Sequence, residues 1–203
     1  EHVPSIQQCV EEALYAFCQQ AVRVHAAGRT DAGVHAHGQV VHLDLDYRKA
    51  DGEERALTGQ DFAKAINAHL RFAPIAVVHA ERVADDFHAR FGALYKTYRY
   101  RVIDRTAKLV MDQRFAWHHK TPLDVDSMRE AAKPLLGHHD FTSFRDSQCQ
   151  AKSPIRTLDH LEITTQPYDE FGGQLIVFEL GARSFLHHQC RNVVGTLAKV
   201  GAG

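Results

Sequence analysis

The sequence lacks the features that would place it in several common classes of protein. No apolar run approaches the ~18 residues that cross a bilayer, and the first residues lack the basic and apolar regions of a signal peptide. Four cysteines stand alone without CxxC spacing, which predicts reduced thiols and a cytoplasmic protein. P-loop, GxGxxG and GxSxG motifs are missing. We therefore expect no membrane-spanning helix, no disulfide framework and none of the usual nucleotide or serine-hydrolase sites.

Charge and histidine content leave the kind of ligand open. The formal net charge is −1, and phosphate binding depends on local basic clusters rather than on the total charge. The 15 histidines include three adjacent pairs, and neighbouring residues of a helix or strand point in different directions. His35 and His37 can share a strand face, but a third ligand is missing nearby. We therefore predict no metal site.

The apolar spacing predicts an alternation of helices and strands. Helical periodicity, with Ser5 and Ser184 as N-caps of the first and last helix, predicts helices over 5–20, 61–70, 124–136 and 184–201. Alternation predicts strands over 22–28, 39–46, 75–83, the second half of 87–104, 158–164 and 173–182. The remaining polar or irregular segments are predicted to be loops over 48–60, 104–122 and 138–157.

This order of elements indicates the fold class. Helices and strands are interspersed and several connections have the length of hairpins, which favours an α+β fold with mainly antiparallel sheet and flanking helices. The second half repeats the element order of the first. We therefore predict two similar lobes, an N-terminal one over residues 1–91 and a C-terminal one over residues 92–203.

The segment GRTDAGVHAHG, residues 28–38, holds one carboxylate, Asp31, in a glycine-bounded loop between two predicted strands. A turn aspartate that bonds its own backbone is the commoner role for this pattern. Alternatively, a carboxylate that stays ionised and is well aimed can act as a nucleophile. It then needs a cation to hold its pKa low. Arg191, which the spacing places on one helix face with His187, is a candidate for that cation.

The segment YKTYRYR interleaves tyrosines with cations. On a strand, Lys96, Tyr98 and Tyr100 share one face, and Arg90 lies just upstream in FHARF. Aromatic rings beside cations suit unpaired bases and their phosphates, but tyrosines in a core with cations in solvent give the same pattern. The residues alone thus leave open a cofactor-free enzyme acting through Asp31 and an RNA-binding module without chemistry.

Four longer segments are similar to the motifs of one enzyme family, in the same order along the chain. They read AGRTDAGVHAHGQVVHLDL, DDFHARFGALYKTYRYRV, LLGHHDFTSFR and SFLHHQCRNVVGTL. On these segments the sequence resembles the tRNA pseudouridine synthase I family over nearly its whole length. The resemblance implies the pseudouridine synthase fold.

The resemblance also implies site residues. Asp31 matches the catalytic aspartate, and Arg191 matches the arginine that pairs with it. Tyr98 matches the tyrosine that stacks on the target uracil. Arg29 matches a loop arginine associated with displacing the target base. We expect Arg90 and Lys96 to contribute to substrate binding.

The implied reaction is the isomerisation of uridine to pseudouridine in the anticodon stem-loop of tRNA, typically at positions 38, 39 and 40. The family uses no metal or organic cofactor and forms a homodimer that holds tRNA. Attack at C1′ and attack at C6 both remain open. A non-catalytic RNA-binding protein, or a metal-dependent hydrolase using Asp31, His35 and His37, is the alternative. The family's opening strand and its last helix and strand are missing here, so we expect a longer protein.

Overall fold

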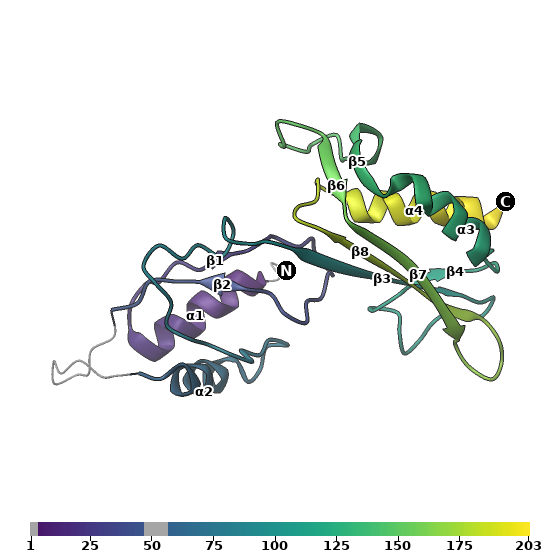
Figure 1. Cartoon of the computed structure of the whole chain (residues 1–203). Coiled ribbons are helices and arrows are strands. Elements are labelled where there is room, and N and C mark those ends of the chain that lie inside the picture. Colours follow the sequence, from purple (N-terminus) through teal and green to yellow (C-terminus); the bar gives the residue numbers. More distant parts are fainter. Residues whose placement is uncertain (1–3, 47–56) are drawn as a thin grey trace. The chain divides into compact units, whose positions relative to one another are not determined.

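The computed structural model describes residues 4–46 and 57–203, and the chain divides into two compact units (Figure 1). Unit 1 comprises Glu1–Ala93 and unit 2 comprises Leu94–Gly203. Most of the loop predicted over 48–60 lies outside the described residues. Within the described ranges, no helix combines the length and apolar character that a membrane crossing requires.

Two helices form the core of unit 1. Helix α1 spans Ile6–Cys18, and its predicted N-cap is confirmed because the Ser5 hydroxyl accepts the Gln8 N–H at 3.1 Å. Helix α2 spans Gly59–Leu70 and begins two residues before the predicted start, since Thr58 caps it. The two helices pack together, and with Val24 from outside the helices they form a core of apolar side chains that are almost fully buried: Ala13, Leu14, Val24, Ile66 and Leu70.

The strands of unit 1 are much shorter than predicted. Strands β1 (His25–Ala26) and β2 (Val41–His42) form a two-residue antiparallel ladder. The strand predicted over 75–83 is wrong, because this segment has no strand neighbour within the described residues. Its Val77 instead donates its N–H to Asn67 and accepts from the same side chain, both at 2.8 Å. One side-chain amide thus replaces a ladder partner.

Unit 2 is built on a four-stranded mixed sheet in the order β4-β3-β8-β7. The strands are β3 Lys96–Asp104, β4 Trp117–His119, β7 His160–Pro167 and β8 Gln174–Ala182. Strand β4 runs parallel to β3, whereas the other neighbours are antiparallel. The prediction of an α+β fold is confirmed, and the sheet is mixed rather than purely antiparallel.

Three strands of unit 2 lie in segments predicted to be loops. Strand β4 belongs to the segment 104–122, while β5 (Gly137–Asp140) and β6 (Ile155–Leu158) pair with each other across the segment 138–157. These strands are three or four residues long, so alternation over so short a length carries little signal. Whether these segments form strands is decided by pairing with strands that lie further away in the sequence.

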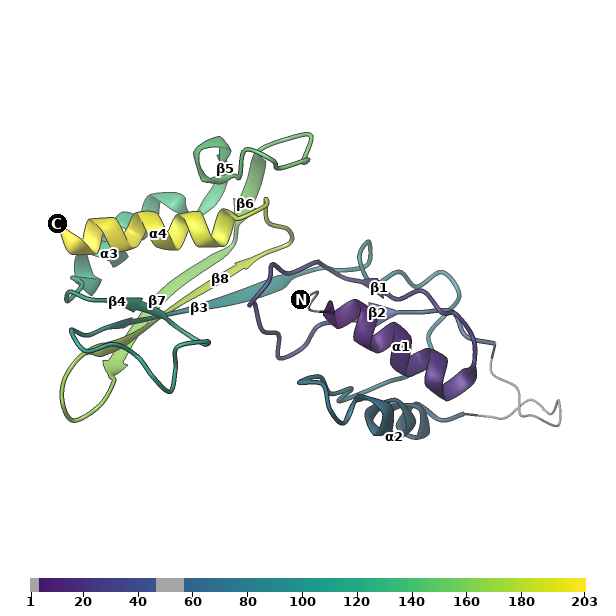
Figure 2. The ribbon, with the colours of Figure 1, turned by 180° about the vertical axis from the view of Figure 1, so that it is seen from behind.

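Helices α3 (Val125–Ala132) and α4 (Gln189–Ala202) cover the same face of this sheet (Figures 1 and 2). The short 3-10 turns η1 (Lys133–Leu135) and η2 (Thr142–Phe144) follow α3. As predicted, the inward face of β8 is fully buried and packs with α4 through Ile176, Phe178, Leu180, Val193, Val194 and Leu197.

The two helices of unit 2 approach closely where α4 ends. A Cβ on Gly201 would lie 2.9 Å from the Met128 side chain, so glycine permits this contact. The Gly201 carbonyl also accepts the Asp124 N–H at 2.8 Å, and Asp124 is the N-cap of α3. The end of one helix thus supports the start of the other.

Candidate active site

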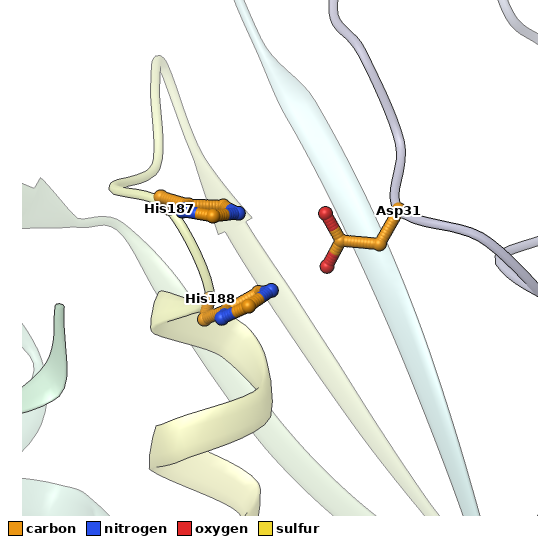
Figure 3. A group of neighbouring side chains, drawn as sticks. All are labelled: Asp31, His187 and His188. Carbon is orange, nitrogen blue, oxygen red and sulfur yellow. The ribbon is translucent and has the colours of Figure 1, made fainter. Parts of the chain in front are cut away.

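Asp31 lies in the loop that connects β1 to β2, as predicted. The loop is closed by Ala27, whose N–H donates to the Val40 carbonyl at 2.8 Å, and by a turn in which the Val34 N–H donates to the Asp31 carbonyl at 3.1 Å. Gly33 has φ of +80°, which favours glycine at this turn. The Asp31 side chain is half-buried and extends from this loop (Figure 3). The hairpin therefore gives the carboxylate a defined backbone frame.

The other loop residues differ in their surroundings. Arg29 is exposed, two residues before Asp31. His35 and His37 are also exposed, and they do not share a strand face, because β2 begins only at Val41. Both histidines therefore lie in an irregular segment. A shared strand face gives no reason to expect that they bind one metal ion together.

Arg90 belongs to a second loop of unit 1, and hydrogen bonds fasten this loop to the hairpin. The Ala89 N–H donates to Nδ1 of His42 at 3.2 Å, and the Gly92 N–H donates to the His88 carbonyl at 2.8 Å. The Arg90 side chain is exposed. This turn therefore presents the Arg90 cation from a backbone that is hydrogen-bonded to His42 of β2.

Strand β3 supplies the aromatic and basic residues of unit 2. Lys96, Tyr98 and Tyr100 are half-buried on one face of the strand, as predicted, although Arg101 on the other face is half-buried as well. The Tyr98 ring meets Phe185 edge to face, with centroids 5.1 Å apart and an angle of 87° between the planes. On the other face, Arg99 pairs with a carboxylate oxygen of Glu179 at 2.8 Å. The half-buried face with Lys96 and Tyr98 is therefore a better candidate for binding a nucleic-acid base than the face with Arg99.

Arg191 lies in the first turn of α4 and is exposed. The prediction that Ser184 caps this helix is wrong, because α4 begins at Gln189 and its N-cap is His188, which is left-handed with φ of 60°. His187 precedes the helix, so the shared helix face predicted for His187 and Arg191 is also wrong. The chain turns at His188 because its side chain is held from outside the helix.

Asp146 holds the two histidines that lead into α4. Its carboxylate accepts from Nδ1 of His188 at 2.8 Å and lies 3.8 Å from Nδ1 of His187. Its backbone N–H also donates to the His187 carbonyl at 3.0 Å. The two imidazole rings are neighbours, with centroids 3.9 Å apart and an angle of 32° between their planes (Figure 3). These histidines connect the start of α4 to the segment that follows η2.

The pKa of the Asp146 carboxyl is lowered from its usual value of 3.8, first by the Gln148 N–H and then by His188. A lowered folded-state pKa stabilises the protein above the unfolded-state pKa, and this stability is lost as pH falls through the folded-state pKa. Asp146→Asn should therefore lower the melting temperature most at pH 5–7, and the difference should shrink below pH 3. Thermal unfolding of both proteins across this range measures the effect.

Asp159→Asn is the matched control, because Asp159 has an exposed side chain. Its melting temperature should follow that of the wild-type protein at every pH. A deficit of Asp146→Asn that is equally large at pH 3 and pH 6 would contradict the role of the ionised carboxylate.

The predicted site residues thus fall into two groups. Arg29, Asp31 and Arg90 belong to loops of unit 1, whereas Tyr98 and Arg191 belong to adjoining elements of unit 2 together with Lys96. The pairing of Asp31 with Arg191 would join the two units and stays a prediction. Asp146 was not predicted from the sequence. The one signal for it is the adjacent pair His187 and His188, because its carboxylate accepts from His188, which lies 42 positions further along the chain.

Comparison with known proteins identifies this architecture. The tRNA pseudouridine synthase family profile matches residues 131–203, which include strands β7 and β8 of the four-stranded sheet and helix α4 of unit 2. The mixed sheet with its flanking helices is therefore a pseudouridine synthase domain.

Relatives resemble the chain over almost its whole length. The tRNA pseudouridine synthase A of Rhodospirillum rubrum is 51% identical over 200 residues, which cover 98% of this chain and 67% of that protein. Those of Dinoroseobacter shibae and Paramagnetospirillum magneticum are 50% and 48% identical, and the matches cover 98% of this chain and 74% and 72% of those proteins. The chain belongs to the tRNA pseudouridine synthase A family, which confirms the resemblance found in the sequence.

Proposed function

We propose that this protein isomerises uridine to pseudouridine in the anticodon stem-loop of tRNA, at positions 38, 39 and 40, with Asp31 as the nucleophile. The observation that carries the proposal is the glycine-bounded hairpin loop, which presents one half-buried carboxylate in a chain about half identical to proteins named tRNA pseudouridine synthase A. The reaction moves one bond within the substrate, so it needs neither an oxidant nor a second substrate.

The chemistry begins with a uridine that leaves the base stack, which costs a few kcal/mol. The Asp31 carboxylate then attacks either C1′ of the ribose or C6 of the uracil, and the glycosidic bond from N1 to C1′ breaks. The base turns within the pocket and C5 bonds to C1′. Loss of the C5 proton and protonation of N1 complete the isomerisation and release the carboxylate.

The remaining residues prepare this attack. Arg191 would lower the pKa of Asp31 by its positive charge and keep the carboxylate ionised. The uracil would stack on Tyr98, whose ring is oriented by Phe185. Arg29 would fill the space that the base leaves, because it is exposed on the loop that carries Asp31.

Contacts with the tRNA backbone and the assembly complete the proposal. Arg90 and Lys96 would bind phosphates, which position the RNA without reading its sequence. Units 1 and 2 would correspond to the two lobes of the family fold, although the described strands of unit 1 are far shorter than those of unit 2. We further propose a cytoplasmic homodimer, and the four free thiols agree with a reducing compartment.

A tritium-release assay tests this function. We expect the purified protein to release tritium from tRNA that contains 5-tritiated uridine, because the C5 proton is lost in the reaction. A transcript with cytidine at positions 38, 39 and 40 is the matched control and should release none. We also expect full turnover in EDTA. Tight binding of both transcripts without release would favour the non-catalytic RNA-binding alternative, and loss of turnover in EDTA would favour a metal-dependent enzyme.

A further inference from the structure

Three histidines of unit 1 form a cluster of rings beside the Asp31 hairpin. His25 and His42 are register partners of β1 and β2, and their rings stack with centroids 5.0 Å apart. The ring of His88, from the turn that carries Arg90, has its centroid 4.5 Å from that of His42 and 6.2 Å from that of His25. The Phe91 ring extends the cluster, with its centroid 4.2 Å from that of His88. The proposed chemistry uses none of these rings.

Two rings of the cluster accept backbone N–H groups at Nδ1. Nδ1 of His42 accepts the N–H of Ala89, at 3.2 Å. Nδ1 of His88 accepts the N–H groups of Arg90 and Phe91, at 3.2 and 3.3 Å. A ring nitrogen that accepts a backbone N–H does so with its lone pair, so these bonds need rings that carry their proton on Nε2. His42 accepts one backbone N–H in this way, and His88 accepts two.

Ala89 makes the His42 bond important for the turn. Ala89 is only 3% exposed, so its N–H has little access to water as a replacement hydrogen-bond partner. His42 and Ala89 are separated by 47 positions, and their bond joins β2 to the 88–92 turn. Loss of the acceptor would therefore release this turn from the hairpin.

We propose that His42 and His88 are positioning residues of the enzyme, which hold the Arg90 turn against the hairpin of Asp31 through the acceptor atoms Nδ1 of their rings. The proposal rests on the proposed function for its catalytic consequence. His42 bonds the turn to the hairpin, and His88 shapes the turn internally, so the two act on the same backbone. Neither histidine needs to touch the RNA.

The rings around His42 come from β1 and from residues 87–88. Within the described residues, the His42 ring lies next to the rings of His25 and His88, and Phe87 is edge-on with its centroid at 6.2 Å. The Glu11 carboxylate of α1 interacts with His25. Contacts from two segments of unit 1 therefore hold the His42 ring in place.

Two substitutions at His42 distinguish the contribution of its acceptor atom from that of its ring. His42→Asn keeps an acceptor atom at the δ1 position but cannot take up a proton, whereas His42→Phe keeps the ring and removes the acceptor. At pH 7.5 we expect His42→Phe to reduce kcat/KM for tRNA by about 10- to 100-fold, as a misplaced binding group does. His42→Asn should stay close to wild type, because it keeps the acceptor of the Ala89 N–H.

Amide hydrogen exchange measured by NMR gives a readout that does not depend on activity. The Ala89 amide should be protected in the wild-type protein and in His42→Asn and should exchange faster in His42→Phe. Equal protection in both variants, or a proton on Nδ1 of His42 at pH 7.5, would overturn the proposal. If His42→Phe does not fold, His88→Asn and His88→Phe provide the same comparison at the Arg90 and Phe91 amides.

The two readouts also separate this inference from the proposed function. If the wild-type protein releases no tritium, the proposed function fails, and the exchange data still decide whether His42 holds the turn. If the wild-type protein is active and His42→Phe retains the full rate with a loosened turn, the function stands and the positioning role is wrong.

Discussion

Asp31→Asn is expected to reduce pseudouridine formation by at least about a thousandfold, because the amide keeps the shape of the side chain but lacks its nucleophilic oxygen. Binding of tRNA should persist, since phosphate contacts supply most of the affinity. Tritium release under single-turnover conditions measures the first quantity, and filter binding measures the second.

The matched control is Asp44→Asn, which removes an exposed carboxylate a few residues beyond the same loop, just after β2. It changes the net charge of the hairpin by the same amount, so any general electrostatic effect on tRNA binding appears in both variants. We expect the control to turn over at the wild-type rate. Normal turnover by Asp31→Asn would remove the nucleophile assignment while leaving the family membership unaffected.

Tyr98→Leu is expected to have the second largest effect, a loss of about 10- to 100-fold in turnover, because stacking of one base on an aromatic ring contributes ~1–3 kcal/mol. Leucine remains an apolar partner for Phe185, whose ring lies edge-on to Tyr98. We therefore expect the sheet to keep its structure and tRNA to remain bound. Single-turnover rates and tRNA affinities of the variant test both expectations.

Tyr98→Phe is the matched control for this position, since it keeps the ring and removes only the hydroxyl. A rate near that of the wild-type protein would assign the effect to stacking, whereas a loss as large as that of Tyr98→Leu would assign it to the hydroxyl. An unchanged rate for Tyr98→Leu would contradict the role of the ring in holding the uracil.

Local periodicity predicted the longer elements well. Helix α1, helix α2 and strand β8 lie close to the expected positions, because each has enough residues to repeat its apolar pattern over several turns or alternations. The segment 75–83 alternates as a strand does, yet Val77 bonds to the Asn67 side chain instead. A pattern specifies which face is apolar, whereas a ladder also requires a neighbouring strand.

In the candidate site, too, local features were predictable from the sequence, whereas features that depend on distant residues were not. The motif around Asp31 was recognisable because its glycines and flanking alternation are local, and the loop does lie between β1 and β2. The start of α4 was predicted wrongly, because the left-handed turn at His188 depends on Asp146, which is 42 positions away. A helix boundary set by a distant carboxylate has no signal within its own segment.

The sequence by itself determined the α+β class, the family and the residues proposed for the chemistry, because these depend on local periodicity and on motifs of adjacent residues. Only the tertiary structure decided how the loops around those residues are held. The His42–Ala89 bond and the His188–Asp146 bond each join segments more than 40 positions apart. Their geometry follows from packing of the whole unit, and no short stretch of sequence contains it.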